Sequence, residues 1–124
     1  PNGEGFETAY PPEKGVDLKA TYSGKDGRKV AWEEFKGFTP GKVTNLMKFP
    51  GVKTNAAVYL YHAFESPSAF KLPLSFGSDD TLTVVFNGKR LVHENHSRGA
   101  APDQDLAEAD VKVGKNELLI KVCQ

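Results

Sequence analysis

The chain has 124 residues, the length of one domain, and can bury a core if it folds into two layers. Lys plus Arg and Asp plus Glu each number 16, so the formal net charge is zero, which argues against broad electrostatic binding to nucleic acid or anionic membrane. The single cysteine, Cys123, excludes an internal disulfide and the multi-cysteine zinc and haem signatures. No stretch approaches the roughly 18 apolar residues of a membrane span. Any ligand is therefore expected to be recognised locally.

The first stretch, residues 1–14, is rich in Gly, Pro and Glu. It includes Pro11 and Pro12, which have no N–H to donate to a sheet ladder. We therefore expect an arm or linker here. Residues 15–124 are expected to form a single domain.

Two short strands are predicted next, one within Asp17–Tyr22 and one over Lys29–Phe35, with a glycine-containing loop between them. The second strand carries Trp32, the only tryptophan. Trp32 is either a core residue or a solvent-facing platform for sugar. The core interpretation is favoured, because aromatic side chains of this size dominate the energetics of burial.

Two strands are predicted in the following stretch. Val43–Phe49 alternates as an edge strand would. Asn55–Glu65 is the longest strand candidate, with Val58 and Leu60 directed to one face and the tyrosines to the other. Because both faces carry apolar groups, this strand is expected to be covered on both sides.

The strongest local signal is Asn87-Gly88, between the runs Leu82–Phe86 and Lys89–His93. A type I′ hairpin turn needs positive φ at both central residues, and Asn followed by Gly adopts it most readily. The two runs are therefore predicted to pair antiparallel. Another strand, Phe70–Phe76, is expected to precede them across a polar turn.

The last part of the chain has one long irregular segment, Glu94–Gln104, and two strands, Leu106–Val113 and Glu117–Val122, joined by a Gly-Lys-Asn turn. Short strands at this spacing, without helical periodicity, predict an all-β fold, an antiparallel two-layer β-sandwich of the jelly-roll kind. The expected core includes Trp32, Val58, Leu60, Phe76, Val84, Phe86, Leu118 and Ile120.

Three stretches carry a family resemblance: GSDDTLTVVFNGKRLVHEN (77–95), SRGAAPDQD (97–105) and VKVGKNELLIKV (111–122). Together they resemble the galactose-binding-like β-sandwich modules appended to multidomain secreted or periplasmic proteins of Planctomycetes, including cytochrome c-containing proteins and carbohydrate-active enzymes. The resemblance implies an extracytoplasmic module with neighbouring domains as partners. Such modules continue past the position of Cys123, so this domain either lacks a final strand or was cut before it.

The long loop holds the candidate ligand-binding residues, since loops of this length inside compact domains are usually functional. The polar groups that would bond sugar hydroxyls belong to His93, Asn95, Arg98, Asp103, Gln104 and Asp105. In a structural alternative the same groups bond one another, with Arg98 paired to Asp103 or Asp105. The sequence leaves both interpretations open.

Asp79 and Asp80 are candidate metal ligands. Two adjacent carboxylates at a strand corner supply the hard oxygen atoms that Ca²⁺ prefers, while an ordinary Asx-turn is the alternative. His93 and His96 have metal-like spacing but no third ligand near them in sequence, which argues against zinc.

No nucleophile elbow, P-loop or dinucleotide motif is present, so the chain is not expected to be an enzyme. The resemblance implies a non-catalytic carbohydrate-binding module that binds polysaccharide weakly and targets a linked catalytic or redox domain. The alternative is a structural sandwich, or spacer, that contacts neighbouring domains and binds no small ligand. Neither interpretation includes a nucleic-acid partner.

Overall fold

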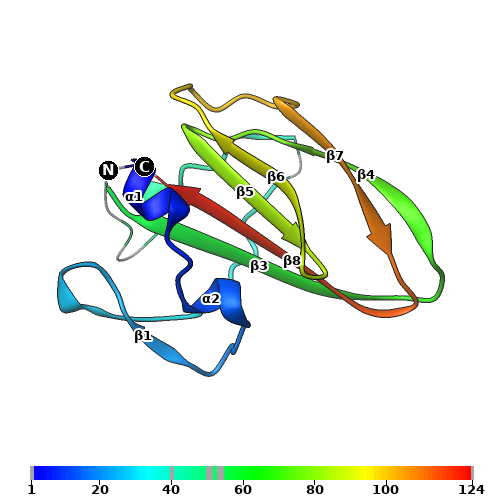
Figure 1. Cartoon of the computed structure of the whole chain (residues 1–124), viewed down its shortest axis with the longest axis horizontal. Helices are drawn as coiled ribbons and strands as arrows, with labels where there is room; N and C mark the ends of the chain where they lie inside the picture. Colours follow the sequence, from blue (N-terminus) through cyan, green and yellow to red (C-terminus); the bar gives the residue numbers. More distant parts are fainter. Residues whose placement is uncertain (1, 40, 50–51, 53–54, 124) are drawn as a thin grey trace.

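The computed structural model describes residues 2–39, 41–49, 52 and 55–123. Within them the fold consists of antiparallel strands with a few short helical turns (Figure 1). The elements are α1 (Asn2–Glu7), α2 (Pro11–Lys14), β1 (Thr21–Ser23), η1 (Lys25–Gly27), β2 (Lys29–Ala31), η2 (Leu46–Lys48), β3 (Ala57–Ser66), β4 (Phe70–Phe76), β5 (Thr81–Phe86), β6 (Lys89–Asn95), β7 (Asp105–Val111) and β8 (Gly114–Cys123). The predicted all-β class is confirmed.

The strands form three antiparallel sheets. The largest has the order β3–β8–β5–β6, while β4 pairs with β7 and β1 pairs with β2. The β4–β7 sheet packs on the large sheet, because Phe76 and Ala107 contact the apolar cluster around Val84. These two sheets make the predicted antiparallel two-layer β-sandwich. Jelly-roll connectivity stays a prediction.

The predicted hairpin joins β5 to β6. Asn87 and Gly88 have φ values of 47° and 80°, so both central residues occupy the left-handed region as a type I′ turn requires. The Asn87 side chain also accepts a hydrogen bond from Glu117 N at 2.8 Å, and Asn87 N donates to Glu117 O at 2.9 Å. The turn is therefore fastened to β8 as well as closing its own hairpin.

The core lies on one face of the large sheet. Val84 and Leu60 are both register partners of Ile120, so these three side chains point the same way. The buried clusters are Leu82, Val84, Val92 and Val122, and Phe86, Ala109 and Val111. Of the expected core residues, Val84 and Phe86 are buried and Phe76, Leu118 and Ile120 pack against them, whereas Val58, Leu60 and Trp32 are half-buried outside both clusters. β3 is an edge strand, which explains why Val58 and Leu60 are less covered.

The strand predicted over Val43–Phe49 is wrong. The chain is irregular there, apart from the single 3₁₀ turn η2, and the Asn45 carboxamide oxygen accepts a hydrogen bond from Met47 N at 3.0 Å. Such side-chain bonds offer the backbone an alternative to a sheet ladder. The strand predicted over Lys29–Phe35 also ends early, at Ala31.

Residues 2–14, in the segment expected to be an arm or linker, fold back over the sheet as α1 and α2. Phe6 is buried and its ring stacks on His93, with centroids 4.2 Å apart. Lys121 is only 2% exposed. Its ammonium donates hydrogen bonds to the carbonyl oxygens of Phe6 at 3.1 Å and Thr8 at 2.7 Å. Because Lys121 follows Ile120 in β8, it points away from the core. The arm thus covers the face opposite to the core.

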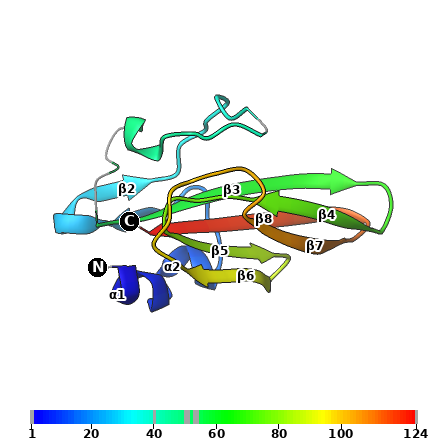
Figure 2. The same ribbon diagram turned by 90° about the horizontal axis from the view of Figure 1, so that it is seen from above.

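The second layer is narrower than the first, two strands against four. Irregular chain at residues 33–39 and 41–49 lies over part of the remaining face, where Leu46 packs against the core. Figure 2 shows this chain and the helices α1 and α2 on opposite sides of the large sheet. None of the helices in the described residues is long and apolar enough to cross a membrane.

Candidate functional site

The Arg98 side chain holds the long loop between β6 and β7. Its guanidinium forms an ion pair with Asp105, in which Nη2 contacts Oδ2 and Nη1 lies 3.4 Å from Oδ1. Nε and Nη2 also donate to the carbonyl and the hydroxyl of Ser78, at 3.3 and 3.2 Å. The side chains of Arg98 and Asp105 are only 19% and 13% exposed. These contacts fasten the loop to the corner that follows β4.

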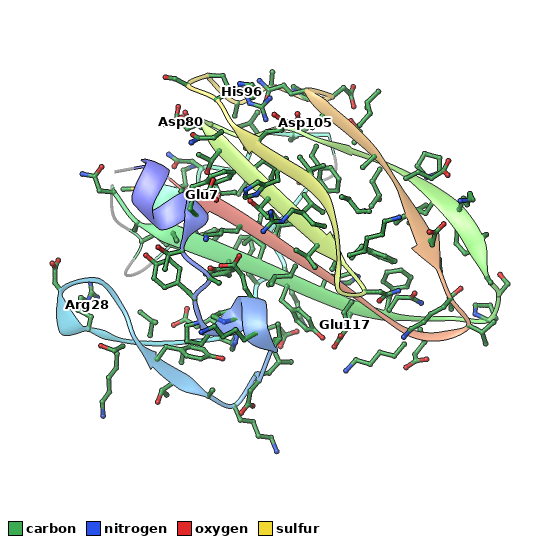
Figure 3. All side chains as sticks on the ribbon, in the orientation of Figure 1. Glu7, Arg28, Asp80, His96, Asp105 and Glu117 are labelled. Carbon is green, nitrogen blue, oxygen red and sulfur yellow. The ribbon has the colours of Figure 1, made fainter. Side chains whose placement is uncertain are left out.

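Backbone and amide groups extend this network. Asp80 N donates to Arg98 O at 2.9 Å, and Arg98 N donates to the Asp80 carboxylate at 3.2 Å. Gln104 accepts a hydrogen bond from Ser78 N at 2.9 Å and donates one to Gly99 O at 2.7 Å. Asp80 and Asp105 lie at the same end of the sandwich (Figure 3). We call Ser78, Asp80, Arg98, Gln104 and Asp105 the loop clamp.

Three of the predicted ligand residues, Arg98, Gln104 and Asp105, therefore bond partners inside the domain. The pairing of Arg98 with Asp105 is the one expected if the loop is structural. A ligand would have to replace these bonds before gaining its own, and the exchange yields little net free energy. The loop clamp is better suited to supporting a site than to contacting a ligand, and ligand binding by these residues stays a prediction.

Two other predicted residues belong to β6. His93 faces the arm: its Nδ1 lies 3.0 Å from the Thr83 hydroxyl and its Nε2 lies 3.6 Å from the Glu7 carboxylate. Asn95 is exposed at the end of the strand, opposite Thr81 in register. The structure therefore does not bring His93 together with the loop clamp, because successive residues of a strand point to opposite faces.

The sixth predicted residue, Asp103, has a different setting. Its backbone has a φ of 58°, and its carboxylate accepts a hydrogen bond from the Ser75 hydroxyl at the end of β4. Asp103 and Ser75 both line an open groove on the core side of the large sheet. Asp79, a predicted metal ligand, lines the same groove. Two carboxylates from different loops therefore line the same groove.

The groove has a volume of about 980 Å³. Its floor is apolar and comes from β3, β5 and β8, through Leu60, Leu82, Ile120 and Val122. One side of the groove is formed by residues 75–79, at the end of β4 and the corner after it, and by residues 100–103. The other side is formed by residues 38–39 and 41–47. The groove lies between these two sets of residues, on a part of the large sheet that the two-stranded layer does not reach. Concave sites with an apolar surface and a few polar groups are typical of ligand pockets.

An exposed aromatic cluster adjoins the groove. The rings of Phe35 and Phe38 have centroids 4.9 Å apart, and those of Phe35 and Phe49 are 4.4 Å apart, both pairs edge to face. Phe35 and Phe38 are nevertheless 46% and 44% exposed, and Phe38 also lines the groove together with Met47. The sequence did not predict this aromatic cluster, because Val43–Phe49 was assigned to a strand. The available signal was the presence of three phenylalanines within residues 35–49.

The two predicted metal ligands, Asp79 and Asp80, have different surroundings. The Asp80 carboxylate accepts from Arg98 N, whereas Asp79 is exposed at the groove. In the part of the chain that the structure describes, no group of three or more His, Cys, Asp or Glu side chains is gathered as a metal site. Two carboxylates with backbone carbonyls can still serve Ca²⁺. Calcium binding at this corner stays a prediction.

A second polar cluster lies under the arm. The Glu13 carboxylate accepts hydrogen bonds from the Tyr59 hydroxyl at 2.5 Å and from the Lys121 ammonium at 3.1 Å. Burial, together with the bond to Glu13, raises the pKa of the Tyr59 hydroxyl. Burial alone would raise the pKa of the Glu13 carboxyl, but the bonds from Tyr59 and Lys121 outweigh it and hold that pKa below its ordinary value. We call Glu13, Tyr59 and Lys121 the arm anchor, since the bonds from Tyr59 and Lys121 to Glu13 tie the arm to the sheet.

Comparison with known proteins adds no relative to this description. Protein-family models, curated proteins and solved structures were each compared with the chain, and none matches it. The resemblance to galactose-binding-like modules therefore stays a prediction that rests on the three quoted stretches.

Proposed function

We propose that this protein is a non-catalytic carbohydrate-binding module that holds a polysaccharide in the groove beside the long loop. The observation that carries the proposal is the groove itself, about 980 Å³, with an apolar floor, the Phe38 ring on one side and carboxylates on its rim. Sugar rings present apolar C–H faces and hydroxyl edges, so they need both kinds of surface at once.

The contacts can be assigned to groove residues. Phe38 and Phe76 offer apolar surface to a sugar ring, and the carboxylates of Asp79 and Asp103 accept hydrogen bonds from hydroxyls. Each such bond contributes only about 1 kcal/mol net, because water is displaced from both partners. Affinity for one module is therefore micromolar or weaker, and retention of a linked domain on polysaccharide would depend on avidity.

The loop clamp has a supporting role in this proposal. Arg98 and Asp105 hold residues 98–105 against the corner after β4, and Asp103 lies within that span. A rim fixed in this way loses less conformational entropy when a ligand binds. Arg98, Gln104 and Asp105 are positioning residues here, and Asp79 and Asp103 are the direct contacts.

A structural spacer is the second candidate function. The pairing of Arg98 with Asp105 inside the domain favours it, since it satisfies the polar groups of the loop without any ligand. The two candidates differ in what the groove does. A spacer needs no groove contact, whereas a binding module loses retention when the groove surface is altered.

Affinity electrophoresis through gels containing soluble polysaccharides tests the proposal. Phe38→Ala and Asp103→Asn should each reduce the retardation of the parent protein. Phe70→Ala is the matched control, because Phe70 is 46% exposed, close to the 44% of Phe38, and does not line the groove. If no polysaccharide retards the parent protein, or if Phe70→Ala acts as strongly as Phe38→Ala, the groove is not a glycan site.

A further inference from the structure

The outer strand β3 has an unpaired edge. It pairs with β8 over all ten of its residues, and no other segment of the described chain pairs its backbone with it. Because the backbone groups of a strand point alternately to its two sides, one row of N–H and C=O groups in β3 has no backbone partner. Residues 57–61 are half-buried, whereas His62, Ala63 and Glu65 are exposed. The C-terminal half of β3 therefore presents this edge, at the border of the large sheet (Figure 1).

The other border strands have features that hinder pairing with a further strand. Short length, bulges, charged side chains and proline are the usual means. The strand β6 begins with Lys89 and Arg90 and has a register shift against β5. Lys71 and Pro73 lie in β4, β7 carries three carboxylates, and β1 and β2 have three residues each. By contrast β3 is long, has an unbroken register with β8 and contains no Lys, Arg or Pro.

The exposed edge of β3 is complementary to itself. We consider two copies that meet about a two-fold axis perpendicular to the sheet at Ala63. Antiparallel pairing then places Ala63 opposite its own copy, His62 opposite Phe64 and Tyr61 opposite Glu65. No two like charges face each other, because Glu65 is the only Asp, Glu, Lys or Arg in β3. The rings of His62 and Phe64, already stacked with centroids 6.0 Å apart, would continue across the interface.

We propose that the exposed edge of β3 docks a second copy of this chain, so that residues 61–65 of two protomers join their large sheets into one antiparallel sheet. The zero net charge of the chain adds no long-range repulsion between copies. An identical partner covers both free edges at once and leaves β6, with its basic residues, at each new border. An added peptide fits less well, because it would itself become a new border strand.

The pairing has a consequence for the groove, which rests on the proposed function. An axis perpendicular to the sheet keeps the same face of both sheets on one side, so both grooves would open on that side. Leu60 of β3 lies in the groove floor, three residues before Ala63. The two copies of Leu60 would therefore lie about 20 Å apart along the strands. Two grooves at this spacing would act together on one polysaccharide chain and supply avidity.

Sedimentation equilibrium tests the pairing. We expect a reversible equilibrium between monomer and dimer within protein concentrations of roughly 1 µM to 1 mM. Ala63→Lys should raise the dissociation constant of the dimer at least about tenfold, because two ammonium groups would face each other. Leu106→Lys is the matched control, since Leu106 is 77% exposed in β7 and gains the same charge away from β3. Equal effects of the two variants, or a parent protein that stays monomeric throughout, overturn the inference.

Introduced cysteines report the register. Two Ala63→Cys protomers should form a disulfide under mild oxidation, since residues directly opposite each other lie within reach of that bond. Glu65→Cys is the control, because its two copies would lie about 14 Å apart along the strands, too far for a disulfide. The native Cys123 is 2% exposed and should not compete. Cross-linking of Glu65→Cys alone, or of neither variant, overturns the proposed pairing.

The outcomes for the pairing and for the proposed function are distinguishable. A dimer that no polysaccharide retards supports the pairing and overturns the proposed function, and a monomer that polysaccharide retards does the reverse. If both proposals hold, Ala63→Lys should be retarded less than Leu106→Lys in affinity electrophoresis, because the monomer has one groove. Equal retardation of these two variants overturns the joint action of the two grooves.

Discussion

Lys121 and Glu13 join the two ends of the described chain, with Nζ of Lys121 3.1 Å from Oε2 of Glu13. Lys121 lies in β8, and Glu13 lies in α2 of the arm. The same ammonium is enclosed by other groups of the protein. It donates hydrogen bonds to the carbonyls of Phe6 and Thr8, and it lies over the rings of Tyr10 and Tyr59, at 5.2 and 5.7 Å from their centroids. Because the ion pair is buried, its loss should cost more than that of a surface pair.

Glu13→Ala is therefore expected to destabilise the protein strongly. It leaves the buried Lys121 ammonium without its carboxylate, and breaking a buried pair in this way costs about 3–5 kcal/mol. We expect the lower end of that range, about 3 kcal/mol, because the Glu13 side chain is 15% exposed. Urea unfolding measures the change. Glu7→Ala is the control, since the Glu7 side chain is 70% exposed and lies 3.6 Å from His93.

The Cys123 thiol reports whether the arm is the part released. Burial raises the pKa of this thiol, and the residue is 2% exposed. A Cβ placed on Gly5 of the arm would lie 4.0 Å from its sulfur. Labelling by a thiol reagent should thus be slow in the parent protein and faster in Glu13→Ala. Equal labelling rates, with equal stabilities, would mean that the arm anchor contributes nothing.

The arm anchor also predicts that the protein loses folding stability at acid pH. The pKa of Glu13 in the folded chain lies below its ordinary value of 4.5, so the unfolded chain binds a proton first as pH falls. The stabilisation is complete above pH 4.5 and is lost as pH falls through the lowered pKa. The stability difference between the parent and Glu13→Gln should shrink over this window. A difference that stays constant from pH 7 to below 4 would contradict the assignment.

Gly88→Val tests the hairpin turn. A Cβ at Gly88 meets nothing within 4 Å, so any loss comes from the backbone, whose φ is 80°. A β-branched residue is a poor occupant of this region, and we expect a loss of more than about 1 kcal/mol. Gly88→Asn is the control, because Asn tolerates positive φ. Thermal unfolding of both variants decides the point, and a neutral Gly88→Val would show that the turn can change type.

The hairpin and most strands were predictable because their signals are local. Asn87-Gly88 needs only its own backbone preference, and β4 is found over the predicted Phe70–Phe76. The prediction of a strand over Val43–Phe49 failed, because alternation of residue types does not show whether a neighbouring strand is available for pairing. There the Asn45 side chain bonds the backbone instead.

The candidate site was only partly predictable for a related reason. Polar composition marked the loop after β6, and Arg98 and Asp105 did prove to be neighbours. Composition could not say whether such groups face a ligand or one another. The groove depends on how much of the large sheet the second layer covers, and that follows from strand pairing distant in sequence. Phe38 is identified as a candidate only by its position at the groove.

Gly77→Ala tests how tightly the groove rim is built. A Cβ on Gly77 would overlap the carbonyl oxygen of Ala101 and lie 3.2 Å from Oε1 of Gln104. The 100–103 loop would have to move away from β4, and such overpacking costs about 1–3 kcal/mol. Gly99→Ala is the matched control in the same loop, because its Cβ would meet nothing within 4 Å. Equal melting temperatures for both variants would show that the rim yields freely.

Arg98→Ala separates support of the loop from contact with a ligand. It removes the ion pair to Asp105 and both bonds to Ser78, and leaves the Asp105 carboxylate 13% exposed without its cation. Bonds to a charged group of this kind contribute about 1.5–3 kcal/mol, so the melting temperature should fall clearly. Arg90→Ala, at an exposed position of β6, should leave it almost unchanged.

Glycan retention of Arg98→Ala, measured well below its melting temperature, then shows what the loop clamp does. Under the binding proposal, retention falls because Asp103 is no longer held in place, and Asp103→Asn loses retention with little change in stability. A fall in melting temperature with no polysaccharide retained by the parent protein would instead make this a structural module. An unchanged melting temperature together with lost retention would reverse the assignment and make Arg98 itself a ligand contact.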